Sequence, residues 1–414
     1  MSKLRNRFRN AFWPVVAGFI GSWAGQMPAQ PWTLTSAPQT NWVSLASSAD
    51  GSLIAAVAFN GPMCISTNGG DSWTTVLLQA NPWITNWTAV TVSADGTRLA
   101  ATTSDLPNLG AQPGLIYLST NSGANWFPSG APTARWSALA GSADGLKLFA
   151  VAKDAGRIYT SSDGGGTWSQ TAAASNEWNS VACSADATVL LACTAGEYSP
   201  GVVCGSTNSG ATWQTNLNGI HYAAVACAAD AATVAVAEAP TYFRGFPYTW
   251  PLDLSFNSRA TWSRANLDDY WKCVTVSAGG NRIIAGARSF PEWSPGGELF
   301  TSSDGQTWET NAFANQTWNA VTCSADGAKA TAASSGIYVR SFPIVQPQLS
   351  LSLTNGQAVL SWIIPSTLFT LQQSIGLTSA WTDVPELPVV RGVRYEVALP
   401  QSGGGTFYRL LHVP

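Results

Sequence analysis

Glutamates with a tyrosine close by are the side chains of this sequence whose types and spacing could do covalent chemistry. Glu197 directly precedes Tyr198, and Glu238 stands a few residues before Tyr242. A tyrosine paired with a glutamate, or two carboxyl groups flanking a bond, can cleave a glycosidic linkage. Glu292 adds another carboxyl group in a similar stretch. Because loop acids are mostly solvated, we treat Glu197, Tyr198, Glu238 and Glu292 as weak candidates and expect no catalytic residue.

The sequence lacks the signature motifs of other classes of enzyme reaction. The chain contains no HExxH, CxxC, GxSxG or Walker A motif. Its two histidines, His221 and His412, are too few and too far apart for a histidine-based metal site. We therefore expect neither a metal nor a cofactor.

Aromatic and basic side chains offer a different chemistry, the non-covalent binding of sugars or peptides. They gather in a few irregular stretches, most densely in 238–251. Aromatic rings provide large, rigid contact surfaces, and arginines bind carboxylates. The candidate ligand-binding residues are Tyr198, Tyr242, Arg244, Tyr248, Trp250, Arg288 and Trp293. Alternatively, these aromatic rings pack on one another and only cover one end of the molecule.

The composition of the whole chain limits its class. The 414 residues carry a net charge of −3, and only 10% of them are charged. This balance argues against a nucleic-acid partner. The 38 glycines and 20 tryptophans favour an all-β protein with many tight turns.

A repeated phrase predicts the elements that position the candidates. An aromatic residue opens W-x-x-V-x-x-S-A-D-G or a close variant, and we number the copies as repeats one to seven. They begin at Trp42, Trp87, Trp136, Trp178, Tyr222, Trp271 and Trp318. Each copy has room for four short strands, and a period of about 45 residues with four strands indicates one β-propeller blade.

The ends of the repeat array complement each other. Repeat seven stops after 336–341 without a fourth strand, and the stretch 31–41 has the register of the missing strand. Pairing the two would close the ring and remove exposed sheet edges. The sequence therefore predicts a seven-bladed β-propeller over residues 31–341, with the N-terminal strand closing the last blade.

A second motif recurs between the third and fourth strands of most repeats, as in SSDGGGTW at 161–168. In such a turn an Asp or Asn accepts backbone N–H bonds, glycine adopts a positive φ, and the tryptophan is buried. The Asp/Asn positions are Asn68, Asn121, Asp163, Asn208, Asn257 and Asp304. We expect them to be structural rather than calcium ligands, because neutral Asn is a weak calcium ligand.

This motif resembles the Asp-box, or BNR repeat, of sialidases, sortilin-type receptors and photosystem-assembly factors. The resemblance spans about residues 31–341 and implies a propeller without implying one activity. Repeat five departs from the motif, since Arg259 replaces its glycine. The Arg-Ile-Pro motif of sialidases is absent, and nothing fixes three arginines in the cluster that such an enzyme needs.

Propeller connectivity predicts which end of the molecule carries function. The turns after the first and third strands of each repeat share one face, which we call the short-turn face. The insertions 104–114, 195–201, 238–251 and 289–297 fall on the opposite face, which we call the long-loop face. Long loops on a rigid scaffold are where binding residues concentrate. We therefore expect the site on the long-loop face of repeats four to six.

Both ends of the chain differ from the repeats. Residues 1–24 join a basic start to an uncharged apolar stretch, which is typical of a secretory signal peptide; an uncleaved anchor is the alternative. Residues 342–348 read as a linker. Residues 349–414 predict a small β-sandwich that resembles a fibronectin type III module of exported bacterial repeat proteins. We expect a monomer without a membrane span in the mature chain, secreted or at the cell surface or in the periplasm.

The seven cysteines leave two interpretations open. Cys183, Cys227 and Cys323 share one position in their repeats, which favours small core residues over a disulfide framework. Cys193 and Cys204 flank one loop and could pair across two strands, since an export compartment permits disulfides.

Together these patterns predict an exported, non-catalytic β-propeller that binds a carbohydrate or a protein segment. A sialidase-like or other glycoside hydrolase is the first alternative, and an assembly or adhesion scaffold is the second.

Overall fold

The regular elements of the protein are β-strands. A computed structural model describes residues 31–78, 86–104, 114–153, 156–195, 201–219, 221–239, 242–243, 246–247, 250–288, 296–314, 316–343, 347–354, 357–365, 369–376, 379–399 and 406–412. Within these ranges no helix occurs, and so none that is long and apolar enough to cross a membrane.

Repeats one to six each form one four-stranded antiparallel sheet, in chain order from the first strand to the last. Repeat one contains β2 (Trp42–Ser47), β3 (Ile54–Ala58), β4 (Met63–Ser66) and β5 (Thr74–Val76). Repeat two contains β6 (Trp87–Val92), β7 (Leu99–Thr103), β8 (Ile116–Ser119) and β9 (Phe127–Pro128). Repeat three contains β10 (Trp136–Gly141), β11 (Leu148–Ala152), β12 (Arg157–Ser161) and β13 (Ser169–Gln170).

The next three repeats follow the same order. Repeat four contains β14 (Trp178–Cys183), β15 (Leu190–Thr194), β16 (Gly201–Ser206) and β17 (Gln214–Gly219). Repeat five contains β18 (Tyr222–Cys227), β19 (Val234–Glu238), β22 (Trp250–Ser255) and β23 (Ser263–Asp269). Repeat six contains β24 (Trp271–Val276), β25 (Ile283–Ala287), β26 (Gly296–Ser302) and β27 (Glu309–Ala314).

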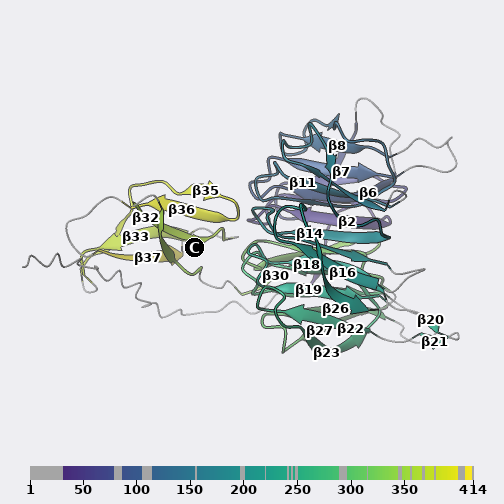
Figure 1. Cartoon of the computed structure of the whole chain (residues 1–414). Helices are drawn as coiled ribbons and strands as arrows, with labels where there is room; N and C mark the ends of the chain where they lie inside the picture. Colours follow the sequence, from purple (N-terminus) through teal and green to yellow (C-terminus); the bar gives the residue numbers. More distant parts are fainter. Residues whose placement is uncertain are drawn as a thin grey trace, which may run out of the picture.

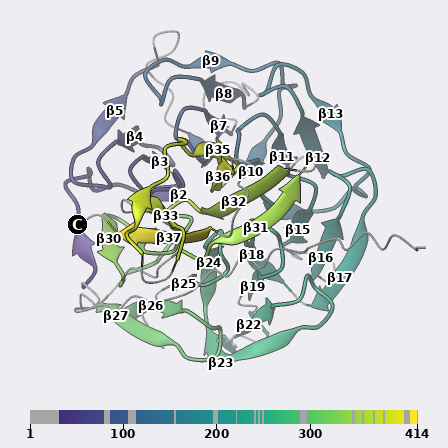
Figure 2. The same cartoon turned by 90° about the vertical axis from the view of Figure 1, so that its left-hand side faces the viewer.

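The sheet of repeat seven is completed by the start of the chain. It contains β28 (Ala320–Cys323), β29 (Lys329–Ala333) and β30 (Ile337–Ser341), and its outer strand is β1 (Thr33–Leu34). Thr33 pairs with Val339, and Leu34 pairs with Tyr338. Two segments at opposite ends of the repeat array therefore share one sheet, and the sheets lie around a ring (Figure 2).

Backbone hydrogen bonds close the inner wall of this ring. The amide of Ala49 donates to the carbonyl of Ala94 at 2.8 Å, and Ala94 donates to Ala143 at 2.7 Å. The series continues from repeat to repeat, with Gly279 as the donor in repeat six, until Ala325 donates to Ala49 at 2.7 Å. These residues belong to the Ser-Ala-Asp turns, so the repeated phrase itself joins each sheet to the next.

The apolar core lies between neighbouring sheets. The second strand of repeats one to six is buried along its whole length, for example β3 and β11. The tryptophans that open the repeats are also buried, from Trp42 to Trp318. Burial of such large rings favours folding by a few kcal/mol each, so each repeat is stabilised mainly by its neighbours.

A second core organises the strands that follow the repeats, β31 to β37, which we call the C-terminal module. One sheet has the order β31 (Ser350–Thr354), β32 (Gln357–Ile363), β36 (Arg394–Ala398) and β35 (Val389–Arg391). The other has the order β34 (Thr382–Asp383), β33 (Phe369–Ser374) and β37 (Phe407–His412). Leu360 and Trp362 of the first sheet share a buried cluster with Leu371 and Tyr408 of the second.

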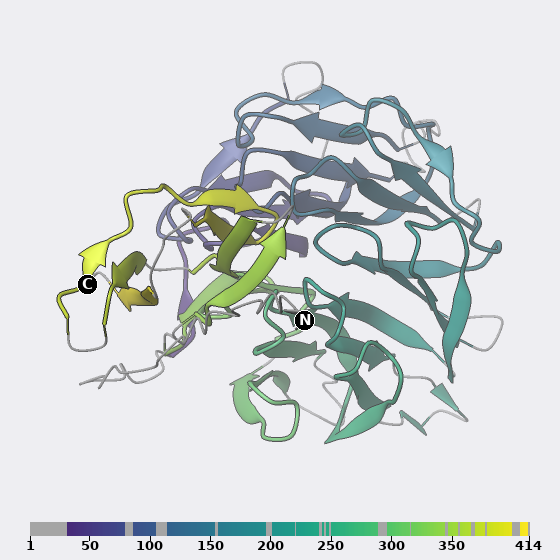
Figure 3. The same cartoon turned by 60° about the vertical axis from the view of Figure 1, so that its left-hand side comes forward.

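The module lies against the short-turn face of the ring (Figures 1 and 3). Ile364 shares a buried cluster with Ala49 and Ala325, and Val393 and Tyr395 pack on it. Because Ala49 and Ala325 belong to the ring of Ser-Ala-Asp turns, the hairpin β35–β36 covers the end of the central channel (Figure 2).

Candidate functional site

The structure describes only part of the predicted ligand-binding set. Tyr198, Arg244, Tyr248 and Trp293 lie outside the described residues, as do the catalytic candidates Glu197 and Glu292. Tyr242 lies in β20 (Tyr242–Phe243), and Trp250 opens β22. The backbone N–H of Arg288 donates to the Tyr270 carbonyl at 2.9 Å. Glu238 is the last residue of β19.

The insertion of repeat five contains a hairpin that the sequence analysis did not predict. Tyr242 pairs with Pro247, and Phe243 pairs with Phe246 of β21 (Phe246–Pro247). The hairpin lies at the end of the ring opposite to the C-terminal module (Figure 1). The long-loop face and the module are therefore on opposite sides of the ring.

Repeat five also departs from the other repeats beneath this insertion. In repeats two, three, six and seven, the opening tryptophan packs edge-on against an aromatic ring of the third strand, with ring centroids 5.1 to 5.8 Å apart. Tyr117 fills this third-strand position in repeat two, and Cys64 fills it in repeat one. The register places Asp253 there in repeat five, where the opening residue is Tyr222.

Asp253 forms a buried carboxyl pair with Glu238. Val236 is directly opposite Asp253, and Glu238 follows two residues later on the same face of the sheet. Glu238 is 5% exposed and Asp253 is 6% exposed. The two carboxyl groups are hydrogen-bonded to each other.

The environment of this pair favours a shared proton. Burial, followed by the charge of Asp253, raises the pKa of Glu238 to about 7, while Arg264 opposes the shift. Burial also raises the pKa of Asp253, again against Arg264. The guanidinium Nε of Arg264 lies 3.6 Å from Asp253 Oδ1, on a side chain that is 71% exposed. The hydrogen bond between them raises the pKa of Glu238 and lowers that of Asp253, so Glu238 donates and Asp253 accepts.

Tyr222 covers the pair from the first strand. It pairs with Glu238 and is 1% exposed. Burial and the nearby charge of Glu238 raise the pKa of its hydroxyl. A Cβ at Gly219 would lie 2.5 Å from that hydroxyl, so glycine at the end of repeat four leaves room for it.

More carboxyl groups lie at the same end of repeats five and six. Asp268 and Asp269 end β23, and Glu298 lies near the start of β26. Burial, with a smaller contribution from Glu298, raises the pKa of Asp269 to about 6. Among the described residues, no group of three or more His, Cys, Asp or Glu side chains is arranged to hold a metal ion.

The geometry of the Glu238–Asp253 pair limits what it can catalyse. Retaining glycosidases hold their two carboxyl groups about 5 Å apart, and inverting enzymes hold them farther apart to admit water. Carboxyl groups in mutual hydrogen-bond contact are closer than either arrangement. Both side chains are also almost fully covered, so the pair does not present two acids to opposite sides of a sugar bond.

The repeated turn motif forms hydrogen bonds within itself. Asp163 accepts from the Ser161 hydroxyl at 2.7 Å and from the Thr167 amide at 2.9 Å. These bonds lower the pKa of Asp163 to about 2, the Thr167 amide first. The Trp168 indole N–H donates to the Gly165 carbonyl at 3.1 Å. Asn68, Asn121, Asn208, Asn257 and Asp304 accept comparable backbone bonds.

The cysteines are all free thiols. Cys193 is opposite Val203, whereas Cys204 is opposite Ala192. Cys193 and Cys204 therefore point to opposite faces of the sheet of repeat four, and the disulfide considered from the sequence does not form. Cys183, Cys227 and Cys323 line a channel cavity of about 180 Å³, which Val393 of the module also lines.

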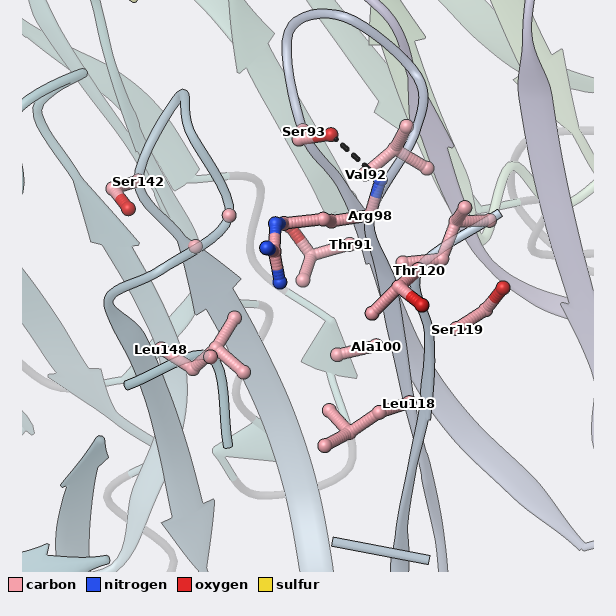
Figure 4. Close-up of a pocket in the computed structure, with 14 residues that line it drawn as sticks. Thr91, Val92, Ser93, Arg98, Ala100, Leu118, Ser119, Thr120, Ser142 and Leu148 are labelled. Carbon is pink, nitrogen blue, oxygen red and sulfur yellow. Dashed lines mark hydrogen bonds between the residues drawn. The ribbon is translucent and has the colours of Figure 1, made fainter. Parts of the chain in front are cut away.

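Two other cavities lie among the described residues. A cavity of about 760 Å³ separates Arg391 and Arg394 of the module from the aspartates of the short turns, such as Asp186 and Asp230. Figure 4 shows a pocket between repeats two and three, into which Arg98 projects. Its volume of about 10 Å³ admits at most one water molecule.

Comparisons with known proteins support the fold. No protein-family model and no curated protein sequence matches the chain. Among solved structures, it is similar to the GH74 xyloglucanase of Xanthomonas campestris, with 15% identity over 81% of this chain and a TM-score of 0.60. The GH74 enzyme of Niastella koreensis matches with 14% identity over 81% of this chain and a TM-score of 0.61. The chain spans 59% of the length of each enzyme.

A second kind of neighbour is matched over nearly its whole length. YCF48 of Cyanidioschyzon merolae matches with 13% identity, a TM-score of 0.54, and coverage of 75% of this chain and 98% of that chain. YCF48 bound to a D1 peptide matches with 14% identity, a TM-score of 0.54, and coverage of 78% and 99%. At these identities the likeness concerns the fold alone, and with the sheet order it shows an all-β protein with a β-propeller fold.

Proposed function

We propose that residues 31–341 form a seven-bladed propeller and that residues 349–414 form a β-sandwich joined to it by the linker 342–348. The ring of amide-to-carbonyl bonds that returns from Ala325 to Ala49 supports the blade count. The shared buried cluster around Trp362 supports the sandwich. On residues 1–24, we propose export to the cell surface, the periplasm or the medium.

We propose further that the propeller binds an extended protein segment at its long-loop face and does not cleave it. One observation carries this proposal: the chain's own module already covers the short-turn face, through Ile364, Val393 and Tyr395. The opposite face carries the hairpin β20–β21 of the repeat-five insertion (Figure 1). A ligand would therefore approach the ring from the long-loop face.

The neighbours favour a protein segment as the first choice of ligand. The chain covers nearly all of YCF48, one structure of which contains a bound peptide. The GH74 neighbours are longer than this chain and are glycoside hydrolases. The likeness to these enzymes makes a carbohydrate ligand, or glycoside hydrolysis, the second candidate function for this chain. The close and buried carboxyl pair of repeat five argues against hydrolysis at that place.

A binding screen with matched variants tests the proposal. The full chain would be presented to a random 12-residue peptide library and to a glycan array. We expect selected peptides that bind the wild-type protein at least 10-fold tighter than a variant with Tyr242, Tyr248, Trp250 and Trp293 changed to Ala. Phe127→Ala with Phe256→Ala is the control, because these exposed rings belong to the repeats and not to the insertions.

Each other outcome of the binding screen favours one of the alternative functions or contradicts the long-loop site. Peptides that bind both variants equally would contradict the long-loop site. Glycans selected in place of peptides would support the carbohydrate candidate. Turnover of fluorogenic glycosides would overturn the non-catalytic assignment, and the absence of any ligand would leave the assembly or adhesion scaffold.

A further inference from the structure

One position of the repeat faces the central channel, and cysteines occupy it in three of the seven repeats. It is the last residue of the first strand, which in chain order is Ser47, Val92, Gly141, Cys183, Cys227, Val276 and Cys323. All seven line the channel cavity of about 180 Å³. The three cysteines are only half-buried, so their side chains are open to this cavity. Because serine, valine and glycine fill the same position elsewhere, folding does not require a thiol there.

Two of these thiols lie in neighbouring repeats. Their strands, β14 and β18, are next to each other in the inner wall of the ring. The Cys183 thiol donates to the carbonyl of Gly141 at 3.2 Å, so the side chain at this position leans toward the preceding repeat. In repeat five the preceding repeat contributes Cys183, which Cys227 therefore faces. A charge on Cys227 also disfavours a charge on Cys183. Cys323 has a valine and a serine as its neighbours at this position instead.

The charges around the pair oppose one another. Burial raises the pKa of both thiols, and the aspartates of the adjoining short turns raise it further. Lys147 lowers the pKa of Cys183, and Arg259 lowers that of Cys227. The free thiols are therefore protonated at neutral pH, while one cation faces each of them.

Arg259 occupies an unfavourable position. It takes the place of a turn glycine and adopts the left-handed conformation, with a φ of 73°. Its Nη1 atom is buried without a hydrogen-bond partner. A buried guanidinium nitrogen without a partner is costly, and the protein retains one whose charge acts on Cys227. An anion formed at that thiol would give this cation a partner.

We propose that the thiols of Cys183 and Cys227 together bind one soft monovalent metal ion, copper(I) or silver(I), and that Arg259 balances the charge of the complex. Each thiol releases its proton and each sulfur forms one bond to the ion, so no electron is transferred. Two thiolates and a monovalent cation carry a charge of −1, which the guanidinium neutralises. This site goes beyond the proposed binding function and does not depend on it.

The number of ligands selects the kind of ion. Thiolate sulfur prefers soft ions, and copper(I) and silver(I) accept two sulfur ligands in a line. Zinc(II) takes four ligands, and the described part of the chain contains no group of three or more His, Cys, Asp or Glu side chains arranged to hold a metal. The sequence does not predict this site, because Cys183 and Cys227 are far apart in the chain until the ring brings repeats four and five together.

The ion would reach the thiols from the short-turn face. The cavity of about 760 Å³ between the module and the ring adjoins the channel cavity, since both are lined by Ala185, Ala229, Ala278 and Val393. Four aspartates of the short turns also line it, against two arginines of the module. This excess of negative charge attracts cations. A peptide bound at the long-loop face would therefore leave the entry free.

Competition for copper(I) on the reduced, ligand-free full chain tests the site. The protein would be titrated without oxygen against the chelator bicinchoninate, whose absorbance reports the copper(I) that the protein has not bound. We expect one ion per chain and a rise in affinity of about 100-fold per pH unit near neutral pH, because two protons leave for each ion. A molar excess of zinc(II) should not displace the copper(I).

Variants locate the ion. Cys183→Ser and Cys227→Ser should each lower the affinity for copper(I) by about 100-fold or more, because one sulfur cannot replace two. Serine fits this position, since Ser47 occupies it in repeat one. Cys323→Ser, at the same position in repeat seven, is the matched control and should bind copper(I) as the wild type does. Arg259→Gly keeps both thiols and should lower the affinity by about 10-fold.

The site is overturned if the wild-type protein does not bind copper(I), if Cys183→Ser or Cys227→Ser retains wild-type affinity, or if Cys323→Ser loses as much. X-ray absorption of the copper-loaded wild-type protein gives a second reading that needs no variant. Two sulfur neighbours are expected, and three sulfurs or nitrogen and oxygen neighbours would contradict the pair. A failed metal site leaves the proposed binding function intact, and a binding screen without any peptide or glycan leaves the metal site standing.

Discussion

At the scale of single residues, the turn motif of repeat five contains a residue that lowers the stability of the fold. Arg259 occupies the position of the turn glycines Gly165 and Gly210, with a φ of 73°. A non-glycine residue in this left-handed region costs about 1 kcal/mol. Its Nη1 atom is buried without a hydrogen-bond partner, so the side chain offers no evident compensation.

Arg259→Gly should therefore stabilise the protein by about 1 kcal/mol. Thermal unfolding by calorimetry would show a higher Tm, and the matched variant Gly210→Arg in repeat four should lower it. A Cβ at Gly210 would lie 2.9 Å from Thr171 Cγ2, which adds a clash to the strain. A lower Tm for Arg259→Gly would show that this arginine has a stabilising contact or a function.

At the scale of elements, β1 joins the first sheet of the ring to the last. Besides its strand pairing, the Thr35 amide donates to the Ile337 carbonyl at 2.9 Å. Removing residues 31–36 would expose the edge of β30, and an exposed edge pairs with other chains. We expect a lower Tm and concentration-dependent dimers in light scattering. Leu34→Ser, which keeps the β1 backbone, is the control and should stay monomeric. An unchanged, monomeric truncation would show that the ring closes without β1.

The strands of the repeats could be predicted from the sequence, whereas the contacts around the repeat-five insertion could not. The alternation of short apolar runs and Ser-Ala-Asp turns suffices to predict the strands of each repeat, because every copy repeats the same local chemistry. The partnership of Glu238 with Asp253 was not predicted, although Glu238 was a candidate. An insertion separates the two, and its length hides the register that places them together. The sequence does not predict the hairpin β20–β21, because aromatic residues at 242–247 are equally compatible with a loop.

At the scale of the whole molecule, the described residues of the module and the ring share an apolar contact that the sequence does not predict. Val393 lies at the tip of the β35–β36 hairpin and lines the channel cavity together with the alanines of the short turns. Short turns with a small alanine leave a depression at the ring's axis, and a hairpin tip fits it. The Ser-Ala-Asp turns thus join neighbouring sheets and also form the apolar surface on which the module packs.

Val393→Asp should release the module from this surface of the ring. A carboxylate there would be desolvated among alanines and close to the short-turn aspartates such as Asp144 and Asp186, which contribute negative charge on the same face. We expect a larger radius of gyration by small-angle scattering and faster proteolysis within 342–348, with little change in the Tm of the propeller. Val389→Asp is the matched control, because Val389 belongs to the same hairpin but is 55% exposed. Equal scattering profiles for the two variants would show that contacts other than the hairpin tip hold the module on the ring.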